Sequence, residues 1–217
     1  GGGPRIKREL DKSNIQSKFI RGLRVTAEKI IDIVESVLID FNNDIVESLK
    51  KFGTDAVSIH TKKNNIIKVT PEAKELGFVG IPNKIDNNLI KNILNKKQVP
   101  IISPLGLGND NHPYNINGDT AAGAIAKSLK SRRLLLMTNV EGVLDKNKKL
   151  IDEISSLEIL KMIEDNTITE GMIPKINTCL DAVNNGVTAV GIIDGRKQHS
   201  ILFEIFSDKG SGTLIRK

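Results

Sequence analysis

At 217 residues, with 39% apolar and 27% charged residues, the chain is long enough for one large α/β domain or two small ones, and it contains no apolar run near the ~20 residues of a membrane-spanning helix. We therefore expect a soluble globular protein with no membrane partner, located in the cytoplasm or in the stroma of an organelle. The net charge of +6 comes from scattered basic pairs without interleaved aromatic residues, which predicts no nucleic-acid partner but a positive field that attracts small anions.

The N-terminal segment is predicted to contain two helices and a hairpin. Pro4 suits the first turn of a helix over residues 4–12, and KFIRGLRVT is typical of a short hairpin that turns at Gly22. Thr26 is expected to cap the long apolar helix that follows, and Gly53 is expected to end it.

Turn residues then separate several shorter elements. Asn64 and Asn65 are expected to form a turn, and Asp86 is expected to cap a helix that ends at about residue 97. The last strand of this region, VPIIS, is mainly apolar and should be buried. The predicted strands are 55–60, 65–70, 77–81 and 99–103.

The second half alternates strands and helices regularly. Strands are predicted over 114–117, 132–138, 187–194 and 212–216, and helices over 119–129, 156–165, from Pro174 onward and over 199–206. Such alternation favours a parallel sheet with helices on both sides. We therefore predict the α/β class, as a three-layer αβα sandwich with a mainly parallel central sheet, in a single domain over residues 1–217.

The opening Gly1-Gly2-Gly3 has two interpretations. It is either a cloning remnant or a phosphate-facing loop. Pro4 and the helix after it favour the loop, because free backbone N–H groups and the helix dipole together make a helix N-terminus an anion site.

The segment NINGDTAAG combines two amides and a carboxylate. Asn115 and Asn117 alternate along a short strand and should face the same side, and Asp119 begins a helix of small residues that allows a ligand to come close. The alternative is that Asp119 is a helix N-cap and the asparagines are turn residues.

Two further segments are candidate phosphate contacts. In TEGMIPKI, Gly171 precedes a helix in which Lys175 occupies the first turn, where the helix dipole disfavours a cation. An anionic ligand at this helix end would explain the lysine, and a solvated lysine is the alternative. Gly142 in MTNVEGVL serves either a nucleotide-contacting loop or an ordinary turn.

The order of the motifs GGGP, GLRVT, LGFVG, PIISPLG, YNINGDTAAG, TNVEGVL, GMIPKI and IIDGRKQHS resembles that of the acetylglutamate kinases, in the amino acid kinase family. The resemblance runs from residue 1 to the C-terminus. It implies phosphoryl transfer from ATP to the side-chain carboxylate of N-acetyl-L-glutamate in arginine biosynthesis, with Mg²⁺ carried by the nucleotide and no metal site on the protein. That carboxylate is ionised at neutral pH, so no general base is needed and catalysis depends on alignment and charge neutralisation.

The resemblance also implies roles for individual residues. Lys175 would neutralise the transferring phosphoryl group and Asp119 would orient that lysine. The implied substrate-binding residues are Gly2, Gly3, Arg24, Asn115 and Asn117. The implied ATP-binding residues are Gly1, Asn139, Val140, Gly142, Val143, Leu144, Thr167, Ile168, Thr169 and Gly171.

Further implications concern organisation and regulation. Residues 1–110 would bind acetylglutamate and form a dimer contact, and residues 111–217 would bind ATP, in a homo-oligomer that is a dimer or a hexamer. The C-terminal motif is similar to that of arginine-inhibited members, where His199, Glu204 and Gly212 match the effector pattern. The alternative for His199 is a helix cap.

The sequence also departs from the family pattern. A strand ending in a Lys-Gly loop normally precedes the glycine triplet, so we interpret GGGP as an active-site loop separated from that segment and the N-terminal part of the fold as incomplete. Asn139 stands where Asp is usual, Glu170 where Gly is common and Gly118 where Ala is usual. The alternative function is a catalytically degenerate regulatory protein that binds arginine or acetylglutamate, and a third is a scaffold that binds neither.

Overall fold

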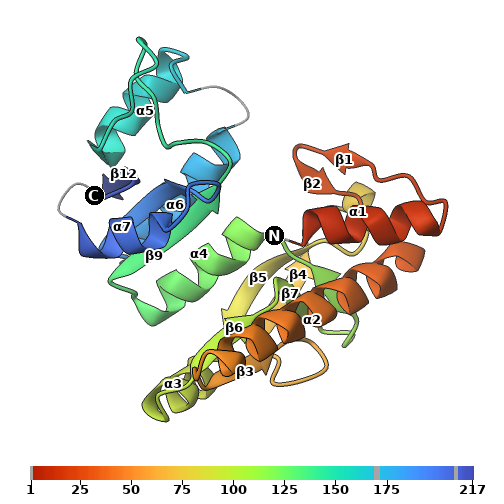
Figure 1. The fold of residues 1–217 in the computed structure, drawn as a ribbon. Coiled ribbons are helices and arrows are strands. Elements are labelled where there is room, and N and C mark those ends of the chain that lie inside the picture. The colour runs from red at the N-terminus through yellow and green to blue at the C-terminus, as the bar shows by residue number, and fades with distance from the viewer. Residues whose placement is uncertain (1, 169–171, 208–209) are drawn as a thin grey trace. The chain divides into compact units, whose positions relative to one another are not determined.

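The computed structural model describes residues 2–168, 172–207 and 210–217 (Figure 1). The chain divides into two compact units, an N-terminal unit (residues 1–121) and a C-terminal unit (residues 122–217), with the boundary inside helix α4. Both contain parallel strand pairs and helices, so the predicted α/β class is confirmed. Within the described ranges, no helix is long and apolar enough to cross a membrane.

The N-terminal unit begins with two helices around a small hairpin and continues with short strands. Its elements are α1 (Gly3–Lys12), β1 (Phe19–Ile20), β2 (Leu23–Arg24), α2 (Glu28–Lys51), β3 (Ala56–Ile59), β4 (Ile67–Pro71), a 3₁₀ turn (Lys74–Leu76), β5 (Gly80–Ile85), α3 (Asn87–Asn95), β6 (Val99–Ile102), β7 (Leu105–Leu107), β8 (Pro113–Asn115) and the start of α4 (Gly118–Leu129).

In its described residues, the C-terminal unit contains the rest of α4 and one four-stranded sheet with three further helices. Its other elements are β9 (Arg133–Thr138), β10 (Glu153–Ser155), α5 (Ser156–Glu164), α6 (Ile173–Asn184), β11 (Ala189–Asp194), α7 (Ser200–Phe206) and β12 (Gly212–Arg216).

Helices α1 and α2 pack together through apolar residues spaced three and four apart. Ile6 and Leu10 of α1 are buried on one face, as predicted, and they share a core with Val34 and Leu38 of α2. This packing holds the N-terminus of α1 close to α2.

The β1–β2 hairpin forms as predicted, but the N-cap of α2 differs from the prediction. Arg21 and Gly22 both have positive φ, the requirement of a type I′ turn. The expected Thr26 cap is wrong, because α2 has Ala27 at its N-cap with no side-chain cap bond. Instead the Thr26 hydroxyl donates to the carbonyl of Arg24 at 2.9 Å.

The strands of the N-terminal unit form two main sheets. One has the order β5-β4-β7-β8 and the other is the parallel pair β3-β6, so the strands on either side of the Asn64-Asn65 turn belong to different sheets. The strand expected over residues 77–81 begins later, at Gly80, and includes Pro82. Proline is tolerated there because β5 is an edge strand, paired irregularly with β4.

Strand β6 is less buried than its apolar sequence predicts. Val99 is 41% exposed, and the remaining residues of the strand are only half-buried. The prediction of a buried strand is therefore wrong, because β6 pairs with β3 alone among the described residues and its Ile101 and Ile102 line a cavity.

Helices cover both faces of the sheet in the C-terminal unit. Its strand order is β10-β12-β11-β9, and β11 is buried along its whole length. Val190 and Ile192 face a core that includes Ile176 of α6. On the opposite face, a Cβ added to Gly191 would lie 3.4 Å from the carboxylate of Glu204 on α7. The alternation of β11 therefore separates α6 from α7, as in an αβα sandwich.

Candidate active site

A cavity of about 370 Å³ in the N-terminal unit gathers the predicted substrate-binding residues. They come from the start of α1, from β2, from the end of β8 and from the segment between β8 and α4. These residues, which all line the cavity, are Gly2, Gly3, Arg24, Asn115 and Asn117. Residues far apart in the sequence thus meet at one concave surface.

Two helix N-termini line this cavity. Helix α1 begins at Gly3 with Gly2 as its N-cap, and α4 begins at Gly118. A Cβ on Gly2 would lie 2.5 Å from Leu38 Cδ2, so glycine lets α1 approach α2 closely here. Because helix N-termini present free N–H groups and partial positive charge, the arrangement suits an anionic ligand.

Arg24 adds a full positive charge to the same cavity. Its Nη1 donates to the hydroxyl of Ser17, and its guanidinium carbon lies 4.7 Å from the centre of the Phe19 ring, in a cation–π contact. Desolvation by burial lowers the pKa of Arg24, although a guanidinium stays charged at neutral pH. The stacked and anchored guanidinium is well placed to bind a carboxylate.

The two asparagines have different local partners. Asn115 Nδ2 donates to the hydroxyl of Thr26 at 3.3 Å. Asn117 Oδ1 accepts from the backbone N–H groups of Asp119 at 2.9 Å and Thr120 at 3.2 Å. Asn117 therefore caps α4, and the alternative in which Asp119 is the cap is wrong. Asp119 lies in the first turn of the helix.

Other walls of the cavity were not identified from the sequence. They come from α2, from the end of β6 and from the turn that follows β6, and they include Leu38, Phe41, Asn42, Ile45, Ile101, Ile102, Ser103 and Pro104. The available signal was Asn42, a polar residue next to Leu38, Phe41 and Ile45 on α2 that is only 3% exposed.

A second cavity, of about 670 Å³, lies in the C-terminal unit and gathers much of the predicted nucleotide segment. The predicted residues that line it are Val140, Gly142, Val143, Leu144, Thr167 and Ile168. Gly142 has φ 151°, and a Cβ there would lie 2.5 Å from the Thr213 hydroxyl. That hydroxyl accepts from the Val143 N–H at 2.8 Å, so the loop rests directly on β12.

Charged residues of the second cavity were also missed. Lys146 pairs with Asp165 at 2.9 Å. The Thr167 hydroxyl and the Lys146 ammonium, by bonding to its carboxylate, lower the pKa of Asp165 to about 2. Lys148 and Met172 complete this part of the lining. Apolar side chains beside cations suit a nucleotide, whose base is flat and apolar and whose phosphates are anionic.

Other predicted residues lie elsewhere or outside the description. Asn139 follows β9, and Lys175 is half-buried in the first turn of α6, after Pro174 as predicted. Among the residues described as lining the two cavities, Asn139, Asp119 and Lys175 do not appear. Gly1, Thr169 and Gly171 lie outside the described residues.

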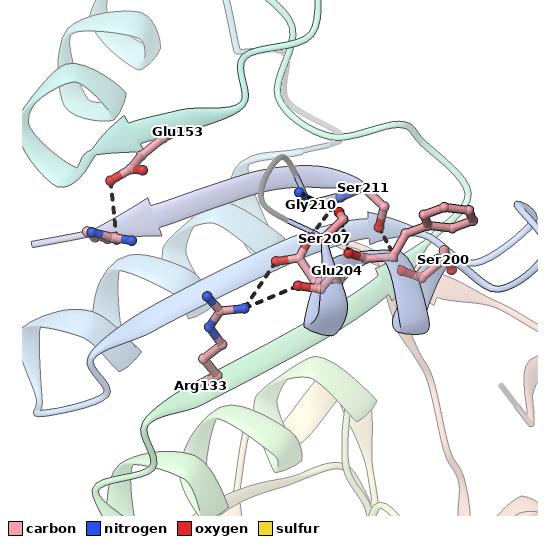
Figure 2. A network of polar contacts seen from close by, with 9 residues as sticks. Arg133, Glu153, Ser200, Glu204, Ser207, Gly210 and Ser211 are labelled. Carbon is pink, nitrogen blue, oxygen red and sulfur yellow. Dashed lines mark hydrogen bonds and ion pairs between the residues drawn. The ribbon is translucent and has the colours of Figure 1, made fainter.

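Glu204, one of the predicted effector residues, belongs to a polar network around α7 (Figure 2). The Glu204 carboxylate accepts from the Ser211 N–H at 2.9 Å and lies 3.8 Å from Arg133 Nη1. A Cβ on Gly212 would lie 1.9 Å from the Ile192 carbonyl oxygen, so only glycine fits. His199 occupies the N-cap position of α7, as its alternative interpretation predicts, but its side chain makes no cap hydrogen bond.

The described ranges contain no group of three or more His, Cys, Asp or Glu side chains that could hold a metal ion. The polar residues of the second cavity include two carboxylates, Asp145 and Asp165, and Asp165 is already paired with Lys146. This donor set fits a magnesium ion held mainly by nucleotide phosphates rather than by a cage of protein ligands.

Comparisons with curated proteins agree with the geometry. An acetylglutamate kinase of Pelagibacter ubique (strain HTCC1062) is 55% identical over 217 residues, which are 100% of this chain and 75% of the relative. An acetylglutamate kinase of Methylobacterium nodulans is 43% identical over 231 residues, covering 100% of this chain and 76% of the relative.

Solved structures and a family model extend the comparison. The structure of the smu.665 protein of Streptococcus mutans UA159 has a TM-score of 0.84 at 30% identity. The match covers 99% of this chain and 82% of the smu.665 chain. The N-acetylglutamate synthase of Neisseria gonorrhoeae, solved with coenzyme A and N-acetyl-glutamate, has a TM-score of 0.89 at 23% identity, over 100% of this chain and 50% of its own, and shows the shared fold. The model of the amino acid kinase family matches residues 1–194. The chain belongs to the amino acid kinase family.

Proposed function

We propose that the protein transfers the γ-phosphoryl group of MgATP to the side-chain carboxylate of N-acetyl-L-glutamate, giving N-acetylglutamyl phosphate in arginine biosynthesis. The observation that carries the proposal is the cavity of the N-terminal unit, where Arg24 and the N-termini of α1 and α4 line one small space with Asn115. A dianionic substrate with an amide group matches such a lining. The similarity to acetylglutamate kinases, which spans the whole of this chain and about three quarters of the relatives, supports the same substrate.

Each group of the substrate has a matching partner in this cavity. The Arg24 guanidinium suits the α-carboxylate, because its planar donors bind both oxygens at once. The amide of Asn115 is suited to hydrogen bonding with the acetamido group or the α-carboxylate, and Asn117 lines the same space. The N–H groups of Gly2 and Gly3 would bind the phosphoryl oxygens, where the α1 dipole favours negative charge.

The reaction joins two anions. A side-chain carboxylate oxygen forms a bond to the γ-phosphorus, the bond from that phosphorus to the β,γ-bridging oxygen breaks, and ADP leaves with the electron pair. No proton has to move, because the attacking carboxylate is already ionised. The protein must therefore align the two anions and offset their charge.

The nucleotide is assigned to the cavity of the C-terminal unit. Val143, Leu144 and Ile168 would contact the base, and Lys146 and Lys148 would contribute positive charge. Magnesium, bound by the phosphates, would neutralise the charge that develops on the leaving group. Lys175 in the first turn of α6 is proposed to neutralise the transferring phosphoryl group, with Asp119 orienting the ammonium.

We also propose that the protein forms a homo-oligomer and acts in the cytoplasm.

Arginine is proposed as an effector that binds to the C-terminal unit. Glu204 is 6% exposed, and its carboxylate supplies the negative charge that a guanidinium requires. Titrating arginine into the protein by calorimetry tests this role. We expect the wild-type protein to show a heat of arginine binding that disappears in Glu204→Gln. Equal heats in both proteins would show that Glu204 does not bind arginine.

A coupled assay of ADP release tests the proposed reaction. With MgATP, N-acetyl-L-glutamate should give ADP, whereas N-acetyl-L-glutamine should bind but give none, because an amide replaces the accepting carboxylate. Calorimetry in the absence of ATP measures substrate binding separately. Binding without ADP release would favour the regulatory alternative, and neither binding nor release would reject the assignment of this cavity.

A further inference from the structure

Asn42 is a buried amide that joins three segments of the N-terminal unit. It lies on α2 and is only 3% exposed. Its Nδ2 donates to the Ile101 carbonyl at 2.8 Å and to the Ser103 hydroxyl at 3.1 Å, and its Oδ1 accepts from the Ser58 hydroxyl at 2.7 Å. Both amide hydrogens and the amide oxygen are therefore used within the protein.

The partners of Asn42 lie at the carboxyl ends of two parallel strands. Ser58 belongs to β3, Ile101 belongs to β6, and Ser103 follows β6 directly. Apolar packing alone would let α2 slide over these strands, whereas a planar amide with several directional bonds permits one position. Asn42 thus fixes α2 against the strand ends that form the opposite wall of the cavity.

Further hydrogen bonds connect this amide to the segment that carries the proposed substrate-binding residues. The Ser103 hydroxyl donates to the Leu38 carbonyl at 3.3 Å, which ties the turn after β6 back to α2. The next carbonyl, that of Pro104, accepts from the Ile116 N–H at 2.9 Å. Ile116 lies between Asn115 and Asn117 in the sequence, and both asparagines line the cavity.

We propose that Asn42 is a positioning residue, which sets the width of the cavity and the placement of Asn115 through Ser103 and the Pro104 carbonyl. The inference rests on the proposed function of this cavity, because Asn42 can change the substrate affinity only if Asn115 binds the substrate. Asn42 does not take part in the reaction, since its amide is occupied by protein partners.

Asn42→Asp in the full chain tests the proposal. The aspartate keeps the shape and the acceptor for Ser58 but replaces a donor with an oxygen that faces the Ile101 carbonyl. We expect the Kd for N-acetyl-L-glutamate to rise about tenfold or more, and the Kd for ATP to stay within about twofold. Amide hydrogen exchange at Ile116, whose N–H donates to the Pro104 carbonyl, should be about tenfold faster or more.

Two matched controls separate positioning from general stability. Asn92→Asp makes the same chemical change at an exposed residue of α3, and Val46→Ala opens a small cavity at a buried residue one turn further along α2. Val46→Ala should lower the Tm while leaving the Kd for N-acetyl-L-glutamate within about twofold. If Asn42→Asp fails to fold, Ser103→Ala removes only the bridging hydroxyl and should weaken binding in the same direction.

The outcomes distinguish this proposal from the proposed function. If Asn42→Asp lowers the Tm as Val46→Ala does but leaves both substrate affinity and exchange at Ile116 unchanged, Asn42 has no positioning role. If the wild-type protein does not bind N-acetyl-L-glutamate, the substrate assignment fails. The exchange measurement then still decides whether Asn42 holds the segment around Ile116, and unchanged exchange would overturn the inference.

Discussion

The side-chain amide of Asn115 donates to the hydroxyl of Thr26, with 3.3 Å between Nδ2 and Oγ1. That hydroxyl donates in turn to the backbone carbonyl of Arg24 at 2.9 Å. One threonine therefore joins the end of β8 to the hairpin strand that carries the guanidinium. Asn115 and Arg24, the amide and the cation of the proposed substrate site, are therefore connected by hydrogen bonds through Thr26.

Arg24→Lys should weaken binding of N-acetyl-L-glutamate by about 10- to 100-fold, because an ammonium cannot bind both carboxylate oxygens in one plane or stack on Phe19 in the same way. Isothermal titration calorimetry measures the effect. Arg21→Lys makes the same change in the exposed turn of the hairpin and should leave the affinity unchanged. Equal affinities for wild type and Arg24→Lys would remove Arg24 from the site.

Two substitutions at Asn117 should separate its capping role from its place in the cavity. Asn117→Ala removes the acceptor for the N–H groups of Asp119 and Thr120 and should lower the free energy of unfolding by about 1 kcal/mol. Asn117→Asp keeps an acceptor and should retain stability, while its charge repels an anionic substrate and raises the Kd. Denaturant unfolding and calorimetry check both, and a destabilised Asn117→Asp would contradict the capping assignment.

Gly212→Ala should lower the free energy of unfolding by about 2 kcal/mol or more without any arginine present, because the new Cβ would lie 1.9 Å from the Ile192 carbonyl oxygen. Gly195→Ala is the control, since its Cβ would come within 3.3 Å of the flexible end of Met137 and no nearer than 3.5 Å to the Thr138 carbonyl oxygen. Thermal denaturation measures both variants. A Gly212→Ala protein as stable as wild type would show that β11 and β12 are not so closely apposed.

Protonation of His60 should destabilise the fold. Desolvation, reinforced by Lys63 and Lys62 and opposed by Glu35, lowers the pKa of His60 below its usual 6.5. The folded state therefore prefers the neutral imidazole, and its contribution to stability is complete above pH 6.5 and is lost as the pH falls through the folded pKa.

His60→Gln should consequently reduce the loss of unfolding free energy between about pH 7 and pH 5. Denaturant titrations at a series of pH values compare the slopes for wild type, His60→Gln and His112→Gln, the last being an exposed histidine. Identical slopes for all three proteins would mean that the imidazole of His60 is not protected from protonation.

Features determined by neighbours in the sequence were predicted well. Ile6 and Leu10 are one helical turn apart, Asp86 caps the helix that follows it, and Arg21-Gly22 forms the hairpin turn. In each case the residues that interact lie within a few positions of one another. The spacing of nearby residues in the sequence is therefore enough to predict these features.

Features determined by distant partners were not predicted. Thr26 is a good N-cap by composition, but its hydroxyl accepts from the amide of Asn115, which lies far along the chain, and donates to the nearby Arg24 carbonyl. Strand β3 pairs with β6 rather than with the next strand in the chain. For the candidate site, motif resemblance identified Arg24 and the glycines, whereas Asn42 emerged only when its partners on β3 and β6 were known.

Lys175 should be needed for fast transfer if it offsets charge on the phosphoryl group. Loss of one preorganised electrostatic contact typically lowers kcat by about 10²- to 10³-fold. Lys175→Met, which retains an unbranched apolar chain, should therefore reduce the rate by about that factor while substrate affinity falls little. Lys161→Met changes another helical lysine, on α5, and should leave the rate unchanged.

Trapping the product with hydroxylamine tests the central claim most directly, because an acyl phosphate reacts with it to give a hydroxamate and inorganic phosphate. With MgATP and N-acetyl-L-glutamate, the protein should form hydroxamate in equal amount to ADP, and Lys175→Met should form it about 100-fold more slowly. ADP formed without hydroxamate, or hydroxamate formed equally fast without Lys175, would contradict the account.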